Sequence, residues 1–559
     1  MIEKFNKFIA VVALFAFFLL LVEVSPYLSR FSGLISSLNL IILGLFIADV
    51  LLQFFSSKKK ALFVKTNWFD LIVFVPLFQF IQGIESTPFF VISRQVVIVV
   101  MLLSRSRRAH RLLSAISLKP AQLLVTSFAF AITVGAILLM LPVSSAGDTH
   151  TSLIDAFFTA TSATCVTGLI VRDTATQFSR FGQSVILFLI QIGGLGIMTF
   201  SVSLALLFRK RVDMKQQRVM QDVLDNQTLS GVKKLILFIF KMTFLIEAAG
   251  AIILFWAWRG SFSNVWERMY HALFHSVSAF CNAGFSTFSN SLMGFSSDLA
   301  TNLVICALII MGGLGFVVIK DLGAVLKNKL DRRIKRNYRL KVQTGIVLKM
   351  TAFLVLAGLA LTYLLEGNRL FAQDPLRLKL LFSFFQSVTT RTAGFNTCDI
   401  ARLSAPTVFL FIILMFIGAS PGSTGGGVKT TTVAVLWSAV ASALRQKENA
   451  EIGRRTIPKD IIFKALTVFI FSLGLVLIFG LVLLYTEGRD FADVLFETVS
   501  AFGTVGLSRG ITPSLTYSGK IIIMLLMFFG RIGPLTVAYA FARYKPANYV
   551  YAEERVLIG

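Results

Sequence analysis

The sequence predicts an all-α polytopic membrane protein in which four related helical units follow one another along the chain. Of the 559 residues, 56% are hydrophobic and only 15% are charged, and the mean hydropathy is +0.78. Soluble domains hold more charge and fewer apolar residues than this. A short glycine-bearing segment, here called the glycine loop, also occurs four times, at residues 164–169, 280–285, 389–396 and 502–507. Its glycines lie 116, 110 and 112 residues apart, which indicates one repeated unit rather than four unrelated helix-breaking glycines.

The net charge of +26 does not indicate a nucleic-acid-binding protein. The basic residues gather in short segments between apolar runs, as the orientation signals of membrane proteins do. Cys165, Cys281, Cys306 and Cys398 show neither a CxxC nor a histidine-paired spacing, so we expect free thiols and no zinc site or disulfide framework. No HExxH motif occurs, and we expect no enzyme.

Residues 1–116 precede the first repeat, and we expect them to form a four-helix membrane domain of their own. The candidate spans are residues 8–24, 38–55, 68–84 and 89–103. No small-residue cleavage site follows the first apolar run, so we interpret it as a retained helix rather than a signal peptide. Basic clusters follow the second and fourth spans, which places the N-terminus in the cytoplasm.

Residues 117–559 should form a second domain of four repeats, at about 119–210, 233–328, 344–443 and 459–545. In each repeat we expect an outer helix, a short pore helix, the glycine loop and an inner helix. The outer helices are predicted at 121–140, 235–256, 346–365 and 461–484, and the inner helices at 184–208, 303–325, 407–441 and 520–541. Eight spans from the repeats and four from the N-terminal domain give about 12 in total. Basic clusters follow every inner helix, so the C-terminus should be cytoplasmic and the glycine loops should open toward the outside.

The third inner helix carries the run Ile-Gly-Ala-Ser-Pro-Gly-Ser-Thr-Gly-Gly-Gly-Val-Lys at residues 417–429. Together with four repeats that each hold a glycine loop, this run makes residues 119–559 resemble the Trk/Ktr/HKT superfamily of potassium transporter membrane subunits. The closing residues 553–559 are similar to the tail of Ktr-type membrane subunits. The four N-terminal spans depart from the family pattern.

The resemblance implies potassium uptake across the cytoplasmic (inner) membrane through a channel-like pore. In the family, glycine at all four loop positions goes with potassium and serine at the first with sodium, so Gly168 favours potassium as the transported ion. The resemblance also implies a homodimer and a cytoplasmic nucleotide-binding regulatory subunit. We expect contact with membrane lipid, and neither nucleic acid nor a tightly bound organic cofactor. Two alternatives stay open, which are a sodium-coupled potassium symporter and a voltage-modulated cation channel.

The glycine loops are the candidate selectivity filter. Rings of backbone carbonyls can replace the hydration shell of a cation without a fixed charge that would trap it, and glycine permits backbone angles that turn carbonyls inward. Pore helices would aim their partial negative C-terminal ends at the same place. We expect potassium at the level of the four glycines. The candidate filter residues are Thr167, Gly168, Asn282, Ala283, Gly284, Thr392, Ala393, Gly394, Thr504, Val505 and Gly506.

Residues 418–427 should form an irregular loop inside the membrane. Pro421 removes a backbone donor and three consecutive glycines disfavour helix. Arg531 lies within the fourth inner helix, where an arginine needs water or acceptors such as free carbonyls. By resemblance this is an intracellular gate, although Arg531 as a purely structural tie between helices is the alternative. The candidate gate residues are Gly418, Ser420, Pro421, Gly422, Gly425, Gly426, Gly427 and Arg531.

Other polar residues have weaker claims. Glu247 is either a coupling acid or a carboxylate hydrogen-bonded within the bundle, and His271, His275 and Glu497 are explained by packing and tethering on the pore helices. Arg391, beside the third glycine loop, resembles a family residue that braces the loop.

In the N-terminal domain, residues 46–49 and 67–70 and the arginines at 105, 108 and 111 resemble a voltage-sensor bundle. Only Arg94 is well inside a span, and one charge is worth about 2.3 kcal/mol per 100 mV. We therefore expect a sensor-like accessory domain rather than a steep voltage sensor.

Overall fold

The computed structural model describes residues 32–56, 120–147, 150–196, 229–330, 340–453 and 455–541, together with a few isolated positions. The chain divides into two compact units, one of Met1–Leu118 with Met140–Ser145 and one of Lys119–Leu139 with Ala146–Gly559. In the first unit the described helix is α2 (Ser32–Ser56), which buries Phe46 and Asp49. The segment 67–70 and the arginines at 94, 105, 108 and 111, on which the voltage-sensor resemblance rests, lie outside the described residues.

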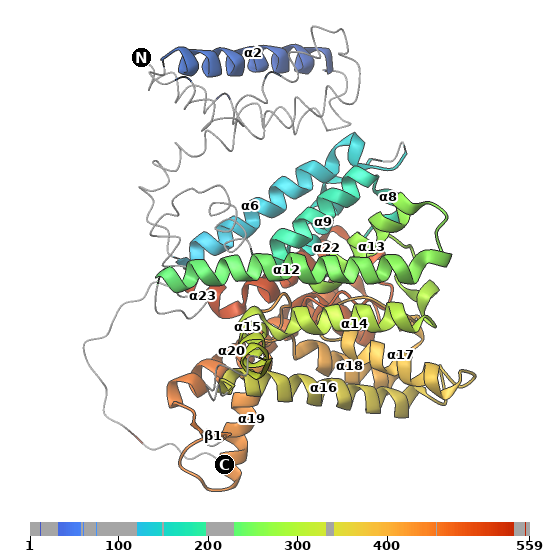
Figure 1. Ribbon diagram of the computed structural model, residues 1–559, viewed down its shortest axis with the longest axis vertical. Helices are drawn as coiled ribbons and strands as arrows, with labels where there is room; N and C mark the ends of the chain where they lie inside the picture. Colours follow the sequence, from blue (N-terminus) through green and yellow to red (C-terminus); the bar gives the residue numbers. More distant parts are fainter. Residues whose placement is uncertain are drawn as a thin grey trace. The chain divides into compact units, whose positions relative to one another are not determined.

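The second unit is built from helices, as Figure 1 shows, and the prediction of an all-α fold is confirmed. Its outer helices are α6 (Pro120–Met140), α12 (Leu229–Ala257), α16 (Val342–Glu366) and α20 (Lys459–Glu487). They begin and end within six residues of the predicted spans. Among the described residues, these four helices are long and apolar enough to cross a membrane, or up to six if two bent helix pairs are each one span. The total of about 12 spans, counted by the length rule, stays a prediction.

A short pore helix follows each outer helix. The four are α7 (Leu153–Thr164), α13 (Val265–Phe280), α17 (Leu376–Thr389) and α21 (Phe491–Gly503). Three of them begin at a polar residue that accepts a hydrogen bond from the first turn, namely Ser152, Asn264 and Asp490, which satisfies backbone donors that a helix start leaves free. Each pore helix packs against its own outer helix or inner helix and leads at its C-terminal end directly into the glycine loop.

The inner helices differ from the predicted spans, two of them by a sharp turn. They are α9 (Arg180–Leu195), α14 (Leu299–Leu314), α18 (Ala405–Phe416) and α22 (Tyr517–Ile532). After α14 the chain turns by 102° into α15 (Phe316–Leu330), and after α22 it turns by 94° into α23 (Pro534–Phe541). The turns lie at Gly315 and Gly533, whose φ angles are +92° and +91°. Such angles end a helix and suit glycine.

The third inner helix is interrupted where the sequence predicts an irregular loop, because α18 ends before Ile417 and α19 (Thr430–Leu444) begins after Lys429. We call residues 417–429 the intramembrane loop.

The outer and inner helices of the third and fourth repeats are also joined by carboxylates. Glu366 is buried and accepts hydrogen bonds from Ser404 N at 2.8 Å and Thr407 Oγ1 at 2.6 Å, and Glu487 accepts from Thr516 Oγ1 at 2.5 Å.

The remaining described elements are short. They are η3 (Pro142–Ser144), α8 (Thr174–Gln177), η4 (Trp258–Gly260), η5 (Met293–Phe295), η6 (Ile400–Arg402), β1 (Glu451–Ile452), β2 (Arg455–Thr456) and η7 (Thr512–Ser514). The strands pair antiparallel, with Glu451 opposite Thr456.

Candidate functional site

The four glycine loops share a pattern of positive φ angles. Gly168, Gly284, Gly394 and Gly506 have φ angles of +94°, +68°, +81° and +88°. Two residues before each glycine, a residue with a side chain also has a positive φ. These residues are Val166, Asn282, Thr392 and Thr504, with φ angles of 57°, 60°, 66° and 50°. Each such angle costs on the order of 1–3 kcal/mol and persists only where the surroundings enforce it, so the loops are held in shape by their neighbours.

Hydrogen bonds to the pore helices supply part of that enforcement. In the first repeat, Thr167 N donates to Ser162 O at 2.8 Å and Gly168 N donates to Ser162 Oγ at 3.1 Å. In the fourth repeat, Val505 N and Gly506 N make the same two bonds to Ser500. Because N–H and C=O point in opposite directions across a trans peptide, binding of the glycine N–H to the pore helix turns the preceding carbonyl away from it.

Those preceding carbonyls form a ring. A Cβ atom added to Gly168 would lie 2.5 Å from Ala283 O, and one added to Gly284 would lie 2.7 Å from Ala393 O. The series continues from Gly394 to Val505 O at 2.5 Å and closes from Gly506 to Thr167 O at 2.1 Å. Each glycine thus faces the carbonyl that precedes the glycine of the next repeat, and the fourth repeat faces the first.

The ring has the properties that a cation site requires. Thr167, Ala283, Ala393 and Val505 are fully buried, and no N–H or hydroxyl group of the described residues donates to their carbonyl oxygens. Within the described part of the chain, no group of three or more His, Cys, Asp and Glu side chains could hold a metal ion. A cation at this place would therefore be held by backbone oxygens.

All eleven candidate filter residues belong to the four loops by sequence, and their role in a filter stays a prediction. The structure shows one further loop residue that the sequence analysis missed. Val166 occupies the place of Asn282, Thr392 and Thr504, and its backbone is equally strained. The sequence analysis overlooked Val166 because its side chain is apolar. Its position two residues before Gly168 could have identified it.

The intramembrane loop contacts the glycine loops at the C-terminal ends of the pore helices. Gly426 N donates to Thr504 Oγ1 at 2.9 Å, and Thr424 Oγ1 donates to Phe280 O at 3.3 Å. The loop also bonds to α14, because Ser420 N donates to Gly313 O at 3.1 Å. The intramembrane loop therefore lies against the glycine loops of the second and fourth repeats.

Three cationic side chains bind carbonyls of this loop. Arg531 donates to Thr424 O and, on α9, to Gly193 O, so it joins the loop to the first repeat as well as to the fourth. Lys429 Nζ donates to Gly425 O at 2.7 Å, and the buried Arg391 donates to Gly418 O at 3.3 Å. The sequence analysis predicted loop carbonyls as acceptors for Arg531 but missed Lys429, whose place four residues after Gly425 in an apolar run was the available signal.

Glycines also set how closely the inner helices approach the pore helices. A Cβ atom on Gly193 or Gly312 would lie 2.0 Å from the carbonyl oxygen of Thr164 or Phe280, and one on Gly530 would lie 1.9 Å from Phe502 O. In three repeats, therefore, the inner helix backbone lies against the end of the pore helix where only glycine fits.

Glu247 lies behind the second glycine loop rather than in the ring. It is buried, and its carboxylate accepts a hydrogen bond from Gln191 Nε2 at 3.2 Å and lies 3.8 Å from Cys281 Sγ. This is the arrangement expected of a carboxylate hydrogen-bonded within the bundle.

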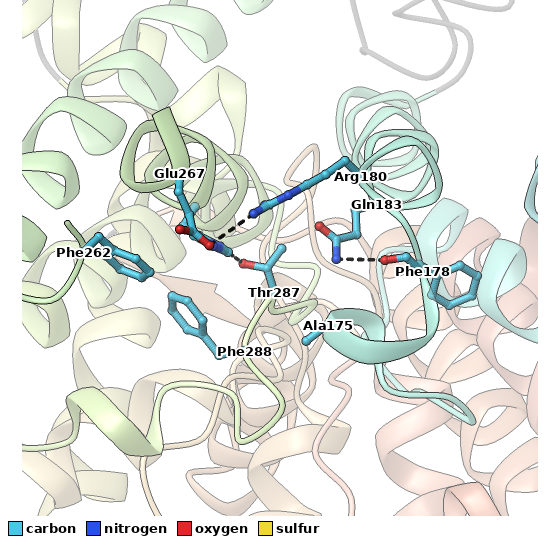
Figure 2. Close-up of a pocket in the computed structure, with 9 residues that line it drawn as sticks. Ala175, Phe178, Arg180, Gln183, Phe262, Glu267, Thr287 and Phe288 are labelled. Carbon is cyan, nitrogen blue, oxygen red and sulfur yellow. Dashed lines mark hydrogen bonds and ion pairs between the residues drawn. The ribbon is translucent and has the colours of Figure 1, made fainter. Parts of the chain in front are cut away.

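A cavity of about 410 Å³ opens between the first two repeats, lined by residues that include Phe178, Phe262 and Phe288. Figure 2 shows Arg180 and Glu267 reaching toward each other across it, and their side chains pair at 3.4 Å. The two charges satisfy each other, and none of the ring carbonyls lines the cavity, so we assign it no contact with a transported ion.

Comparison with known proteins shows which proteins the chain resembles in sequence and in fold. The model of the TrkH family, described as a cation transport protein, matches residues 88–551. The chain is 43% identical to the Ktr system potassium uptake protein B of Bacillus subtilis over 79% of this chain and 97% of that protein. It is 37% identical to the potassium/sodium uptake protein NtpJ of Enterococcus hirae, with coverage of 79% and 98%. The crystal structure of the potassium transporter TrkH from Vibrio parahaemolyticus has the same fold, with a TM-score of 0.64, 18% identity, and coverage of 84% of this chain and 96% of that one.

Proposed function

The chain belongs to the TrkH family of cation transport proteins, and from this premise we propose that it takes up potassium through a channel-like pore with a four-glycine selectivity filter. The family consists of ion transporters and not of enzymes. The apolar helices and the fold make it a multi-pass membrane protein. Its location in the inner membrane, with both termini in the cytoplasm, is part of the proposal.

The observation that carries the proposal is the ring in which each glycine faces the carbonyl of the next repeat. Four buried carbonyl oxygens without donors among the described residues can replace water around a potassium ion. No acidic side chain belongs to the glycine loops, so the ion meets partial charges rather than a fixed charge that would hold it. The C-terminal ends of the pore helices add partial negative charge beside the ring. Potassium would occupy the level of Gly168, Gly284, Gly394 and Gly506.

The intramembrane loop is the proposed gate. Its hydrogen bonds to Thr504 and Phe280 hold it against the ring, and Arg531 and Lys429 hold its carbonyls from the side. Opening the pathway would require these bonds to break together. The same residues, Gly418 to Gly427 with Arg531, were indicated by the sequence.

Three further features belong to the proposal without a structural observation of their own. We expect a homodimer, a cytoplasmic nucleotide-binding regulatory subunit, and residues 1–116 as an accessory domain that modulates the pore. The match of the family begins at residue 88, so the last candidate span of that domain lies within the region that the family shares.

Coupling to sodium is the second candidate. The relative NtpJ of Enterococcus hirae is described as a potassium/sodium uptake protein, and Glu247 is a buried carboxylate behind the second glycine loop. Potassium flux measured at several sodium concentrations separates the two candidates, since only a symporter requires sodium.

The full-length protein in liposomes tests the main proposal. With opposite gradients of potassium and sodium across the membrane, and both ions present on each side, the reversal potential should lie close to the potassium equilibrium potential. A permeability ratio PK/PNa near one would contradict the potassium filter.

A further inference from the structure

In each repeat, a side chain of the pore helix bonds to the segment that follows the glycine loop. In the fourth repeat, Glu497 on α21 is fully buried, and its Oε1 accepts hydrogen bonds from Ser508 Oγ at 2.5 Å and from Thr512 Oγ1. Ser508 lies two residues after Gly506, and Glu497 lies nine residues before it. The pair therefore bridges the two ends of the glycine loop.

The second repeat has the same tie made from different residues. His275 lies nine residues before Gly284, is fully buried, and has its Nε2 3.0 Å from Ser286 Oγ, two residues after the glycine. Its Nδ1 is 2.9 Å from the carbonyl of His271 and must donate to it, so in a neutral ring Nε2 accepts from the Ser286 hydroxyl. The ring stacks on Phe288 at 4.5 Å, which fixes its orientation.

In the third repeat an amide side chain makes the corresponding bond between the pore helix and the segment after the glycine. Gln386 is fully buried eight residues before Gly394, and its Nε2 donates to Thr397 Oγ1 at 3.3 Å, three residues after the glycine. A carboxylate, an imidazole and an amide thus stand eight or nine residues before the glycine in three pore helices, each bonded to a hydroxyl two or three residues beyond the glycine. We call these pairs, Glu497–Ser508, His275–Ser286 and Gln386–Thr397, the loop straps.

The first repeat lacks a strap among its described residues. Nine residues before Gly168 stands Thr159, whose hydroxyl donates to Asp155 O within its own helix at 2.8 Å, and two residues after the glycine stands Ile170. This loop is tied further out instead, by Arg172 Nε to Asp155 Oδ2 at 3.0 Å. Thr159 is therefore a natural comparison for the three strap residues.

We propose that the loop straps are positioning elements of the selectivity filter, holding the glycine in the conformation that points the carbonyl before it into the ring. The proposal rests on the function proposed above. The positive φ angles of Asn282, Thr392 and Thr504, two residues before the glycines, persist only where the surroundings enforce them. The pore helix serines Ser278 and Ser500 fix the near flank, and the straps fix the far one. Releasing a strap lets the loop relax, so the ring discriminates less between potassium and sodium while the helices remain packed.

A double-mutant cycle on the fourth repeat tests this. The variants are Glu497→Met, which removes the acceptor at similar volume, Ser508→Ala, and the two combined, each in the full-length chain in liposomes. Because Ser508 Oγ also accepts from Gly510 N at 2.9 Å, the cycle is needed to isolate the strap from that local turn. We expect each single variant to lower PK/PNa about two- to tenfold, the factor that one net hydrogen bond represents, and the double variant to lower it no further than the larger single effect.

Two variants separate the strap from general damage. Glu497→Gln keeps an oxygen that accepts from Ser508 and should keep the wild-type ratio, and Thr159→Val removes a hydroxyl from the same place in the unstrapped repeat and should also keep it. Melting temperatures in detergent are measured alongside, since a merely structural role would change stability without changing the ratio. Ser286→Ala repeats the test in the second repeat should a Glu497 variant fail to insert.

Gly168→Ser serves as the reference for the filter itself. If it lowers PK/PNa while the strap variants leave the ratio at the wild-type value, the straps do not position the filter and the proposed function stands. If additive losses appear in the cycle, Glu497 and Ser508 act separately and the strap is refuted. A wild-type protein without preference for potassium refutes the proposed function instead.

Discussion

Substitution of the first filter glycine by serine is the sharpest test of the carbonyl ring. Gly168 has a φ angle of +94°, and a Cβ atom placed on it would lie 2.5 Å from Ala283 O and 3.1 Å from the Cα atom of Gly284. Cβ atoms essentially never approach another heavy atom closer than 3.0 Å. Ala283 O, or the serine itself, must therefore move by about 0.5 Å, a displacement that follows from those two distances and strains the backbone.

The size of the effect follows from the strain. A side chain in this backbone region costs on the order of 1–3 kcal/mol when the ring stays closed. The loop can avoid that cost by moving one of four ring carbonyls, so the loss of potassium binding is bounded by the same energy. An energy of about 1–3 kcal/mol corresponds to a factor of roughly 5–150. We expect Gly168→Ser to lower PK/PNa by a factor within that range.

The assay is the reversal potential of the purified protein in liposomes with mixed potassium and sodium. Gly147→Ser is the matched control, because Gly147 has a φ angle of +77° but nothing within 4 Å of its Cβ position. It also places a side chain on a positive φ, but it lies outside the glycine loops and the loop straps, and its ratio should equal that of the wild type. Equal reversal potentials for wild type and Gly168→Ser, at matched expression, would refute the reasoning.

Three further predictions concern the gate and the accessory parts. Deletion of residues 420–427 should raise potassium conduction because it removes the segment that lies against the ring; flux at or below the wild-type level would count against a gate. Lys429→Met should raise basal flux by about two- to tenfold, because the carbonyls of Gly425 and Gly426 lose a charged donor, and an unchanged flux would limit Lys429 to packing. Removal of residues 1–116 should leave selective uptake measurable, since every glycine loop lies downstream; a truncated protein that inserts but carries no potassium at any voltage would make those residues part of the pore.

The outer helices, pore helices and glycine loops were predictable because each has a local signature. Apolar runs of spanning length gave the outer helices within six residues, and Pro421 with three glycines marked the interruption of the third inner helix. Hydropathy could not show the turns at Gly315 and Gly533, because the apolar pattern continues through both and a positive φ leaves no trace in composition. The bond of Arg531 to Gly193 O joins the fourth repeat to the first, so it too required the fold.

The ring also determines the earliest point in synthesis at which the proposed pore can be complete. Gly506 lies against the carbonyl of Thr167, and Lys520 of the fourth repeat pairs with Asp155 of the first at 2.7 Å. More than three hundred residues separate the partners in both contacts. A nascent chain that contains only the first three repeats has three of the four ring carbonyls. The fourth, that of Val505, belongs to the last repeat. The proposed filter is therefore complete only after the fourth glycine loop, which follows α21, has been inserted.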